Sequence, residues 1–122
     1  MKLQLASAEG NFITGSGPGW VRIGTHEYRE NLVLTAEVIR TGWAPAGFDA
    51  LTEADYAGLL DHAPDLVVLG TGATIRFPHH RLTQALTAAR VGVEVMDTAA
   101  ACRTFNVLTA EGRKVLAALI VV

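Results

Sequence analysis

The sequence predicts an α/β fold: a three-layer single domain over residues 1–122, with a central mixed sheet, flanking helices and a small antiparallel β element from the amino-terminal half. Two observations carry this prediction. Residues 2–40 contain short stretches rich in β-branched and aromatic residues, separated by turns with glycine, asparagine and serine. After Trp43 the pattern alternates between strand and helix, which is typical of crossover units over a sheet.

The amino-terminal half reads as a strand meander. Val21 and Ile23 alternate with Trp20, Arg22 and Gly24, so this stretch is expected to be a half-buried strand. The polar stretch 24–30 is predicted to be the turn into the next strand, within 31–39. Residues 42–50, punctuated by glycine and proline, then form the connection to the helical half.

The first helix has clear start and stop signals. Thr52 is a good N-cap, and Asp55 stands where the acid of a capping box belongs. Leu51 and Tyr56 have the spacing of a hydrophobic staple. Pro64 ends the helical region because the residue before a proline is biased away from helical angles.

Residues 66–69 form a continuous apolar run, as expected of a strand covered on both faces. A second helix is predicted from apolar residues at helical spacing and ends near Arg90. The residues on that face are Leu82, Ala85, Leu86 and Ala89. Residues 93–96 then form a further strand.

A third helix is predicted to begin at Asp97 or Thr98 and to stop near Gly112, since glycine is favoured just past a helix end. It is expected to bury Ala101, Phe105 and Leu108. Residues 114–122 read as a last, largely buried strand. If the strands ending at positions 69 and 96 are parallel, their carboxyl ends lie at one edge of the sheet, where ligands bind preferentially.

Composition excludes several classes of protein. A net charge of −2 leaves no overall nucleic-acid footprint. The single cysteine, Cys102, cannot form an internal disulfide, which fits a reducing compartment. Residues 1–20 lack the zones of a signal peptide, and the longest late apolar run, 115–122, is too short to cross a bilayer. We therefore expect a soluble, cytoplasmic protein with no membrane partner.

The candidate site starts from the loop Gly70, Thr71 and Gly72. The loop does not complete the dinucleotide-binding pattern, because Ile75 stands where its third glycine belongs, and no Gly-Lys-Ser/Thr follows to make a P-loop. Asp97 stands where a ribose-binding acid could be, but this match is partial, and no cofactor is predicted. The simpler explanation is that the glycines provide a positive φ angle or a close backbone approach.

A looser hypothesis is a crevice for a small anion or polar ligand. Thr71, Gly72 and Arg76 belong to one loop, and the amino end of the helix from Thr98 presents unpaired N–H groups at the same edge. The alternative is that Arg76 merely solvates a turn.

Other reactive side chains carry weaker signals. Cys102 is interpreted as a small buried core thiol, because the sequence shows no base to activate it. The histidines have no ligand-pair spacing, so metal binding is not expected. These histidines, His26, His62, His79 and His80, are expected to be solvated, with the last two beside the crevice.

Arg103 and Asn106 share one face of the third helix, away from its apolar stripe. They are candidates for the crevice. The preferred alternative is that Arg103 or Arg113 pairs with Glu111, and that Asn106 hydrogen-bonds neighbouring backbone to fix the helix on the sheet.

Taken together, these residues resemble one small domain family of unknown function, which includes the mitochondrial NADH dehydrogenase (complex I) assembly factor three and an adipogenesis-associated domain protein. The resemblance is strong over residues 66–121 and weaker from Gly19 to Trp43. The residues that carry it are Gly70, Gly72, Pro78, Met96, Thr98, Arg103, Thr104, Phe105, Asn106, Leu108, Glu111, Gly112 and Arg113. The resemblance implies the three-layer α/β fold, no established catalysis and, by analogy with the assembly factor, contact with a protein partner.

The leading functional interpretation is a non-enzymatic binding or assembly-factor-like domain that acts by protein contact around the Gly70 loop and the start of the third helix. The alternative is an enzyme or binding protein for an anionic metabolite at the same place. We expect a monomer or weak homo-oligomer, because an exposed sheet edge is a template for pairing.

Overall fold

The computed structural model describes residues 3–5 and 10–122; the part of the predicted meander at residues 2 and 6–9 lies outside them. The strands are β1 (Leu3–Leu5), β2 (Ile13–Gly17), β3 (Trp20–Ile23), β4 (His26–Tyr28), β5 (Leu32–Leu34), β6 (Val38–Thr41), β7 (Leu66–Gly70), β8 (Gly92–Met96) and β9 (Val115–Leu119). The α-helices are α1 (Glu53–Ala57), α2 (Gln84–Ala88) and α3 (Thr98–Ala110), and short 3-10 turns are η1 (Phe48–Ala50), η2 (Gly58–His62) and η3 (His80–Thr83).

The strands form two sheets. The main sheet has six strands in the order β1-β6-β5-β9-β7-β8, and the small sheet is antiparallel in the order β2-β3-β4. In the main sheet β7 is parallel to both β8 and β9, whereas β5 is antiparallel to β9 and β6. The predicted mixed sheet with a small antiparallel element is therefore confirmed. Strands from the amino-terminal half enter both sheets.

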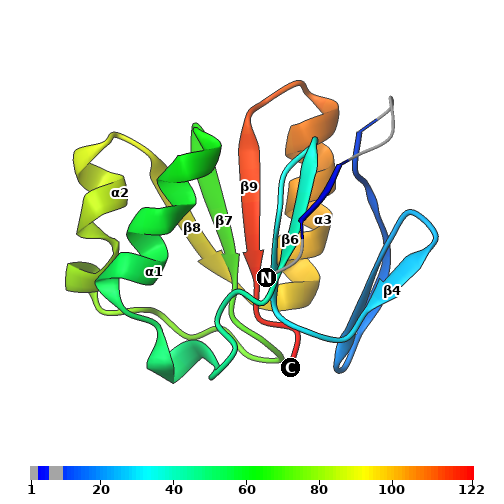
Figure 1. Ribbon diagram of the computed structural model, residues 1–122, viewed down its shortest axis with the longest axis horizontal. Helices are drawn as coiled ribbons and strands as arrows, with labels where there is room; N and C mark the ends of the chain where they lie inside the picture. The colour runs from blue at the N-terminus through cyan, green and yellow to red at the C-terminus, as the bar shows by residue number, and fades with distance from the viewer. Residues whose placement is uncertain (1–2, 6–9) are drawn as a thin grey trace.

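The elements stack in three layers (Figure 1). Helices α1 and α2 cover one face of the main sheet, while α3 and the small sheet lie against the other. Alternate residues of β7 divide between these layers: Leu66 and Val68 pack with α3, and Val67 and Leu69 pack with the α1–α2 side. All of β7 is buried, as the apolar run 66–69 predicts.

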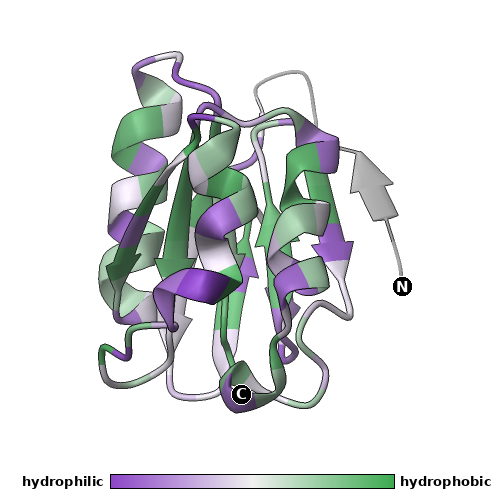
Figure 2. Ribbon diagram, turned by 90° about the vertical axis from the view of Figure 1, so that its left-hand side faces the viewer, coloured by the Kyte–Doolittle hydropathy of each residue, from purple (hydrophilic) through white to green (hydrophobic). Residues whose placement is uncertain are grey.

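Hydropathy follows the same layering. Figure 2 shows apolar strands lying between helices that carry hydrophilic as well as apolar residues. Apolar burial on both faces of the central strands supplies the main driving force for this arrangement. In the part of the chain that the structure describes, no helix has the length and hydropathy to cross a membrane.

Most local predictions hold. Thr52 caps α1 in a capping box with Asp55, as expected. Asp97 caps α3, which ends two residues before Gly112. The second helix is shorter than predicted, because its first turn is the 3-10 segment η3, and Ala89 lies exposed beyond its end.

One local prediction is wrong. The stretch 24–30 is not simply a turn, because its central residues form β4 and pair with β3. The polarity of this stretch reflects its position at the edge of the small sheet: His26 and Glu27 are exposed. An edge strand with charged side chains resists pairing with other chains, so polarity here does not signal a loop.

Candidate functional site

The loop after β7 bends where α3 approaches the strand closely. A Cβ on Gly70 would lie 2.9 Å from Ala101 Cβ and 3.0 Å from Thr98 Cα, so only glycine fits. Gly72 has a φ of 100°, an angle that favours glycine. Both structural reasons that the sequence suggests for the glycines, close approach and positive φ, are therefore present.

Thr98 connects this loop to α3 and to the last strand. Its hydroxyl accepts a hydrogen bond from the Gly72 amide at 2.8 Å and donates to the Ile120 carbonyl at 2.7 Å. Its own amide donates to the Gly72 carbonyl at 2.9 Å. The expectation that the loop and the start of the third helix meet on one rim of the sheet is confirmed.

Thr71 is part of the same network rather than a free ligand. It is only 2% exposed, and its amide donates to the Met96 carbonyl at 3.0 Å. Its hydroxyl donates to the Thr74 carbonyl and accepts from the Arg76 amide, both at 2.9 Å. The polar groups of Thr71 therefore hold the turn closed and do not point outward to a phosphate.

The amino end of α3 is also largely satisfied. The Asp97 carboxylate accepts from the Ala100 amide at 2.8 Å, and the Asp97 carbonyl accepts from the Ala101 amide at 2.9 Å. A carboxylate at this position already complements the positive end of the helix dipole. A second anion would have to approach Asp97 against like charge.

A pocket of about 480 Å³ opens beside this network. It lies between the β2–β3 turn, the loop after β7, the first turn of α3 and the end of the chain. Its lining residues are Ser16, Gly17, Pro18, Gly19, Gly72, Ala73, Asp97, Thr98, Ala99, Ile120, Val121 and Val122. We call it the rim pocket. Small and apolar residues dominate it, and among the described residues that line it Asp97 is the one charged side chain.

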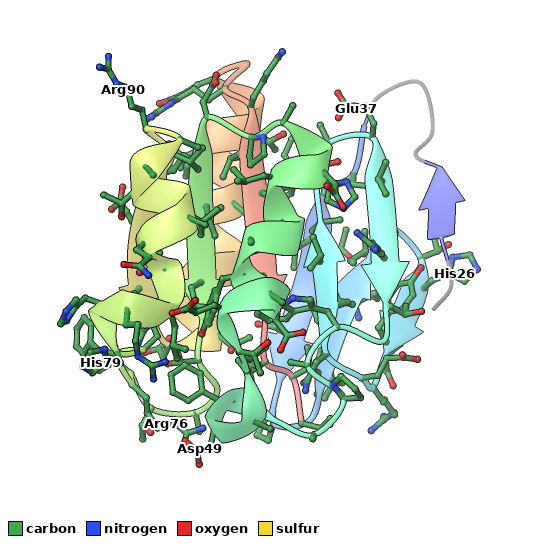
Figure 3. All side chains as sticks on the ribbon, turned by 60° about the vertical axis from the view of Figure 1, so that its left-hand side comes forward. His26, Glu37, Asp49, Arg76, His79 and Arg90 are labelled. Atoms are coloured by element: carbon green, nitrogen blue, oxygen red, sulfur yellow. The ribbon has the colours of Figure 1, made fainter. Side chains whose placement is uncertain are left out.

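Arg76 belongs to a different surface. Its guanidinium lies 3.3 Å from the Asp49 carboxylate, with Cζ 4.5 Å from the centroid of the Phe48 ring. Figure 3 shows Arg76 and Asp49 together at the lower edge, beside η1. The structure thus places the Arg76 side chain with η1 and outside the lining of the rim pocket, although its amide is bonded to Thr71.

Asn106 fixes α3 to the small sheet. Its amide nitrogen donates to the Ile13 carbonyl at 2.7 Å, and its side-chain oxygen accepts from the Ile13 amide at 2.9 Å. The preferred interpretation from the sequence, backbone hydrogen bonding by Asn106, is confirmed. Neither Asn106 nor Arg103 is among the lining residues of the rim pocket.

The expected ion pair at the end of α3 does not form. Glu111, Arg103 and Arg113 are all exposed, and no salt bridge joins them within residues 10–122. Exposed pairs gain little free energy in water, so nothing holds these side chains together.

Cys102 is buried, as predicted. Burial raises the pKa of its thiol to about 11, although the Ser16 hydroxyl and Arg103 act in the opposite direction. A thiol with such a pKa is protonated at neutral pH and is a poor nucleophile.

The histidines stand apart from the rim pocket. His79 and His80 stack their rings 4.2 Å apart, and His79 accepts from the Arg81 amide at 3.1 Å. His62 lies 3.0 Å from Arg40, and its pKa is lowered by burial first and by Arg40 second. Across the described ranges, no three His, Cys, Asp or Glu residues come together as a metal site.

Sequence reasoning missed a second clamping asparagine. Asn31, 4% exposed, donates to the Ala44 carbonyl at 2.7 Å and accepts from the amides of Val121 and Val122. It therefore holds the tail that forms one wall of the rim pocket. Its signal in the sequence is an amide side chain directly before the apolar run 32–34. A polar side chain that is buried beside such a run is expected to be hydrogen-bonded.

The chain is similar in sequence to known proteins. An uncharacterized protein of Rhodobacter capsulatus is 41% identical over 110 residues, which cover 88% of this chain and 82% of that protein. The mouse NADH dehydrogenase [ubiquinone] 1 alpha subcomplex assembly factor 3 is 33% identical over 107 residues. That alignment covers 86% of this chain but only 57% of the mouse protein, so the chain spans little more than half its length.

A solved structure shares the whole fold. A crystal structure of a protein from Bordetella parapertussis superposes with a TM-score of 0.85 at 31% identity, covering 95% of this chain and 99% of the other. A family model described as "Protein of unknown function (DUF498/DUF598)" matches residues 13–120. The chain belongs to this family of unknown function, which the sequence resemblance anticipated.

Proposed function

We propose that this chain is a non-enzymatic, assembly-factor-like domain that binds a partner protein through the rim pocket. The observation that carries the proposal is the chemistry of the pocket: about 480 Å³, walled by small and apolar residues, with the neighbouring backbone amides already bonded. Such a pocket suits an apolar side chain of another protein, because anchor residues in protein interfaces fill desolvated pockets.

The relatives support the same class of function. The mouse relative is named an assembly factor, and its aligned region corresponds to this chain. A shared fold does not by itself imply a shared function. The relative therefore supports only the general class, an assembly factor, and the contact site is inferred from the pocket. We include in the proposal the cytoplasmic location that the single cysteine suggests.

An anionic metabolite is the weaker candidate. It would need a cation in the pocket, but Arg76 is paired with Asp49 and stacked near Phe48. The carboxylate of Asp97 lies in the lining instead. Titration with inorganic phosphate, followed by NMR, tests this candidate; shifts confined to Thr98 and Gly72 would favour it over a protein partner.

The proposal is tested with a substitution that blocks the rim pocket and leaves the hydrophobic core unchanged. Ala99 is exposed and lines the pocket, so Ala99→Arg is expected to fill it. Ala110, exposed at the other end of α3, provides the matched control Ala110→Arg. In quantitative pull-downs from the source cell, a partner should be retained by the wild type and A110R and lost by A99R.

Two outcomes would count against the proposal. One is recovery of nothing above background with the wild-type protein. The other is an unchanged set of captured proteins with A99R, which would move the contact away from the rim pocket.

A further inference from the structure

Strand β8 ends the main sheet and leaves one of its edges open. The Met96 carbonyl accepts from the Thr71 amide, and Met96 is in register with Gly70 of β7. Because the N–H and C=O of one residue in a strand point to the same side, Glu94 also faces β7, and Val93 and Val95 face outward. In the described part of the chain, no group is bonded to the outward amides and carbonyls of Val93 and Val95.

A second pocket, of about 500 Å³, runs beside this edge on the α2 side. Val93 and Val95 form its floor, and Phe77, His80, Thr87 and Arg90 contribute to its walls. Phe77 is 72% exposed although it is aromatic. In Figure 3, His79 and Arg90 mark the two ends of this side of the molecule.

These two features match the requirements of strand addition. In that mode, main-chain hydrogen bonds to an open edge give affinity, and pockets for alternate side chains give specificity. Residues of an added strand that lie opposite Val93 and Val95 point to the same face as these valines. Their side chains would therefore enter the pocket beside Phe77.

Charge decides between a second copy of this chain and a different partner. Glu94 is exposed and lies on the other face of β8 from the pocket. The antiparallel self-pairing that uses all the outward groups of Val93 and Val95 would place Glu94 directly opposite Glu94 of the second copy. Like charges directly opposite each other are destabilising, so the strand favours a partner with a basic residue at this position.

We propose that β8 accepts an extended segment of a partner protein as an additional strand, with apolar side chains opposite Val93 and Val95 and a lysine or arginine opposite Glu94. This inference rests on the proposed function in that both require a protein partner. It does not depend on the rim pocket, which lies elsewhere and has its own variant, A99R.

The test uses a capped octapeptide of alternating valine and lysine, with a valine and glutamate octapeptide for comparison. The lysine peptide should shift the NMR signals of the Val93 and Val95 amides and slow their hydrogen exchange. Val95→Pro removes one N–H that faces away from β7, so the hydrogen bonds between β7 and β8 are kept. Proline is tolerated at such positions of edge strands. It is expected to weaken peptide binding about tenfold.

A charge reversal gives a readout that does not depend on the folding of the proline variant. Glu94→Lys should invert the preference, so that the glutamate peptide binds better than the lysine peptide. Glu111→Lys, an exposed position at the far end of α3, makes the same change in net charge and should leave the preference unchanged.

Three results would overturn the inference. The first is no effect of either peptide on Val93 and Val95, and the second is an equal response of E94K and E111K. The third is concentration-dependent dimerisation in light scattering that V95P abolishes, which would make a second copy the occupant. None of these results affects the comparison of A99R with A110R, so failure here is distinguishable from failure of the rim pocket.

Discussion

Asn106 and Ile13, ninety-three residues apart, are joined by a reciprocal pair of hydrogen bonds in which the side-chain amide of Asn106 replaces a neighbouring strand for the backbone of Ile13. The register between β2 and β3 shifts between Ile13 and Gly15. The asparagine therefore holds the small sheet against α3 where its own ladder is irregular.

Asn106→Ala should lower the free energy of unfolding by about 2 to 3 kcal/mol, because it leaves a buried amide and carbonyl of Ile13 unpaired. Urea denaturation measures the effect. Arg103→Ala, exposed on the same helix, is the control and should change stability by less than about 0.5 kcal/mol. Equal effects of the two variants would contradict the clamping role.

Thr98→Ala removes the hydroxyl that bridges Gly72 and Ile120, and should cost about 2 kcal/mol. Thr98→Ser keeps the oxygen and should recover most of that loss. Thermal unfolding of both variants distinguishes hydrogen bonding from packing; a serine variant as unstable as the alanine variant would assign the effect to the lost methyl group.

Gly70→Ala should destabilise the fold by about 1 to 3 kcal/mol, because the added Cβ would meet Ala101 and Thr98 at 3.0 Å or less. Gly58→Ala is the matched control: its Cβ would meet nothing within 4 Å, and its φ is −60°. That substitution should be neutral or slightly stabilising, because alanine restricts the unfolded chain. Chemical denaturation of both variants decides whether close approach or glycine flexibility matters at position 70.

Tyr56→Phe should raise stability at neutral pH by about 1 kcal/mol. The Tyr56 hydroxyl is buried, and no hydrogen-bond partner for it exists among the described residues. A loss of more than about 1 kcal/mol would show instead that the hydroxyl has a partner.

The same substitution should change the alkaline limb of the stability curve. Burial, followed by the charge of Asp55, raises the pKa of Tyr56 to about 12. The unfolded state ionises near pH 10 while the folded state stays neutral. The part of the unfolding free energy that depends on a neutral Tyr56 is therefore complete below pH 10, and it is lost as pH rises toward 12. Unfolding free energies measured at several alkaline pH values should fall less steeply for Tyr56→Phe than for the wild type.

Cys102 should be inert in the folded protein. Its buried thiol has a pKa of about 11, so Ellman's reagent at pH 8 should react slowly with the native protein and rapidly in denaturant. Rapid reaction under native conditions would contradict the burial of this thiol.

Local patterns in the sequence determined the order and type of most elements. The capping box at Thr52 could be read directly, because a cap bonds to amides only two or three residues away. The start of α3 could be predicted only as Asp97 or Thr98, and the structure makes Asp97 the cap. The apolar run 66–69 predicted a doubly covered strand because side-chain alternation disappears when both faces are buried. The loop at Gly70 and the helix start at Thr98 could be placed on one rim because parallel strands align their carboxyl ends.

Tertiary structure alone decided the partners of the polar side chains. Arg76 lies with Asp49, twenty-seven residues away, so no cationic side chain is among the described residues that line the rim pocket. Asn106 and Asn31 bond to segments about ninety residues distant. Tertiary structure also decided how the amino-terminal strands divide between the two sheets, because strand pairing depends on register and packing between distant segments. Periodicity and capping describe the backbone over a few residues, whereas these contacts exist only once the layers have packed, and they determine what the candidate site can bind.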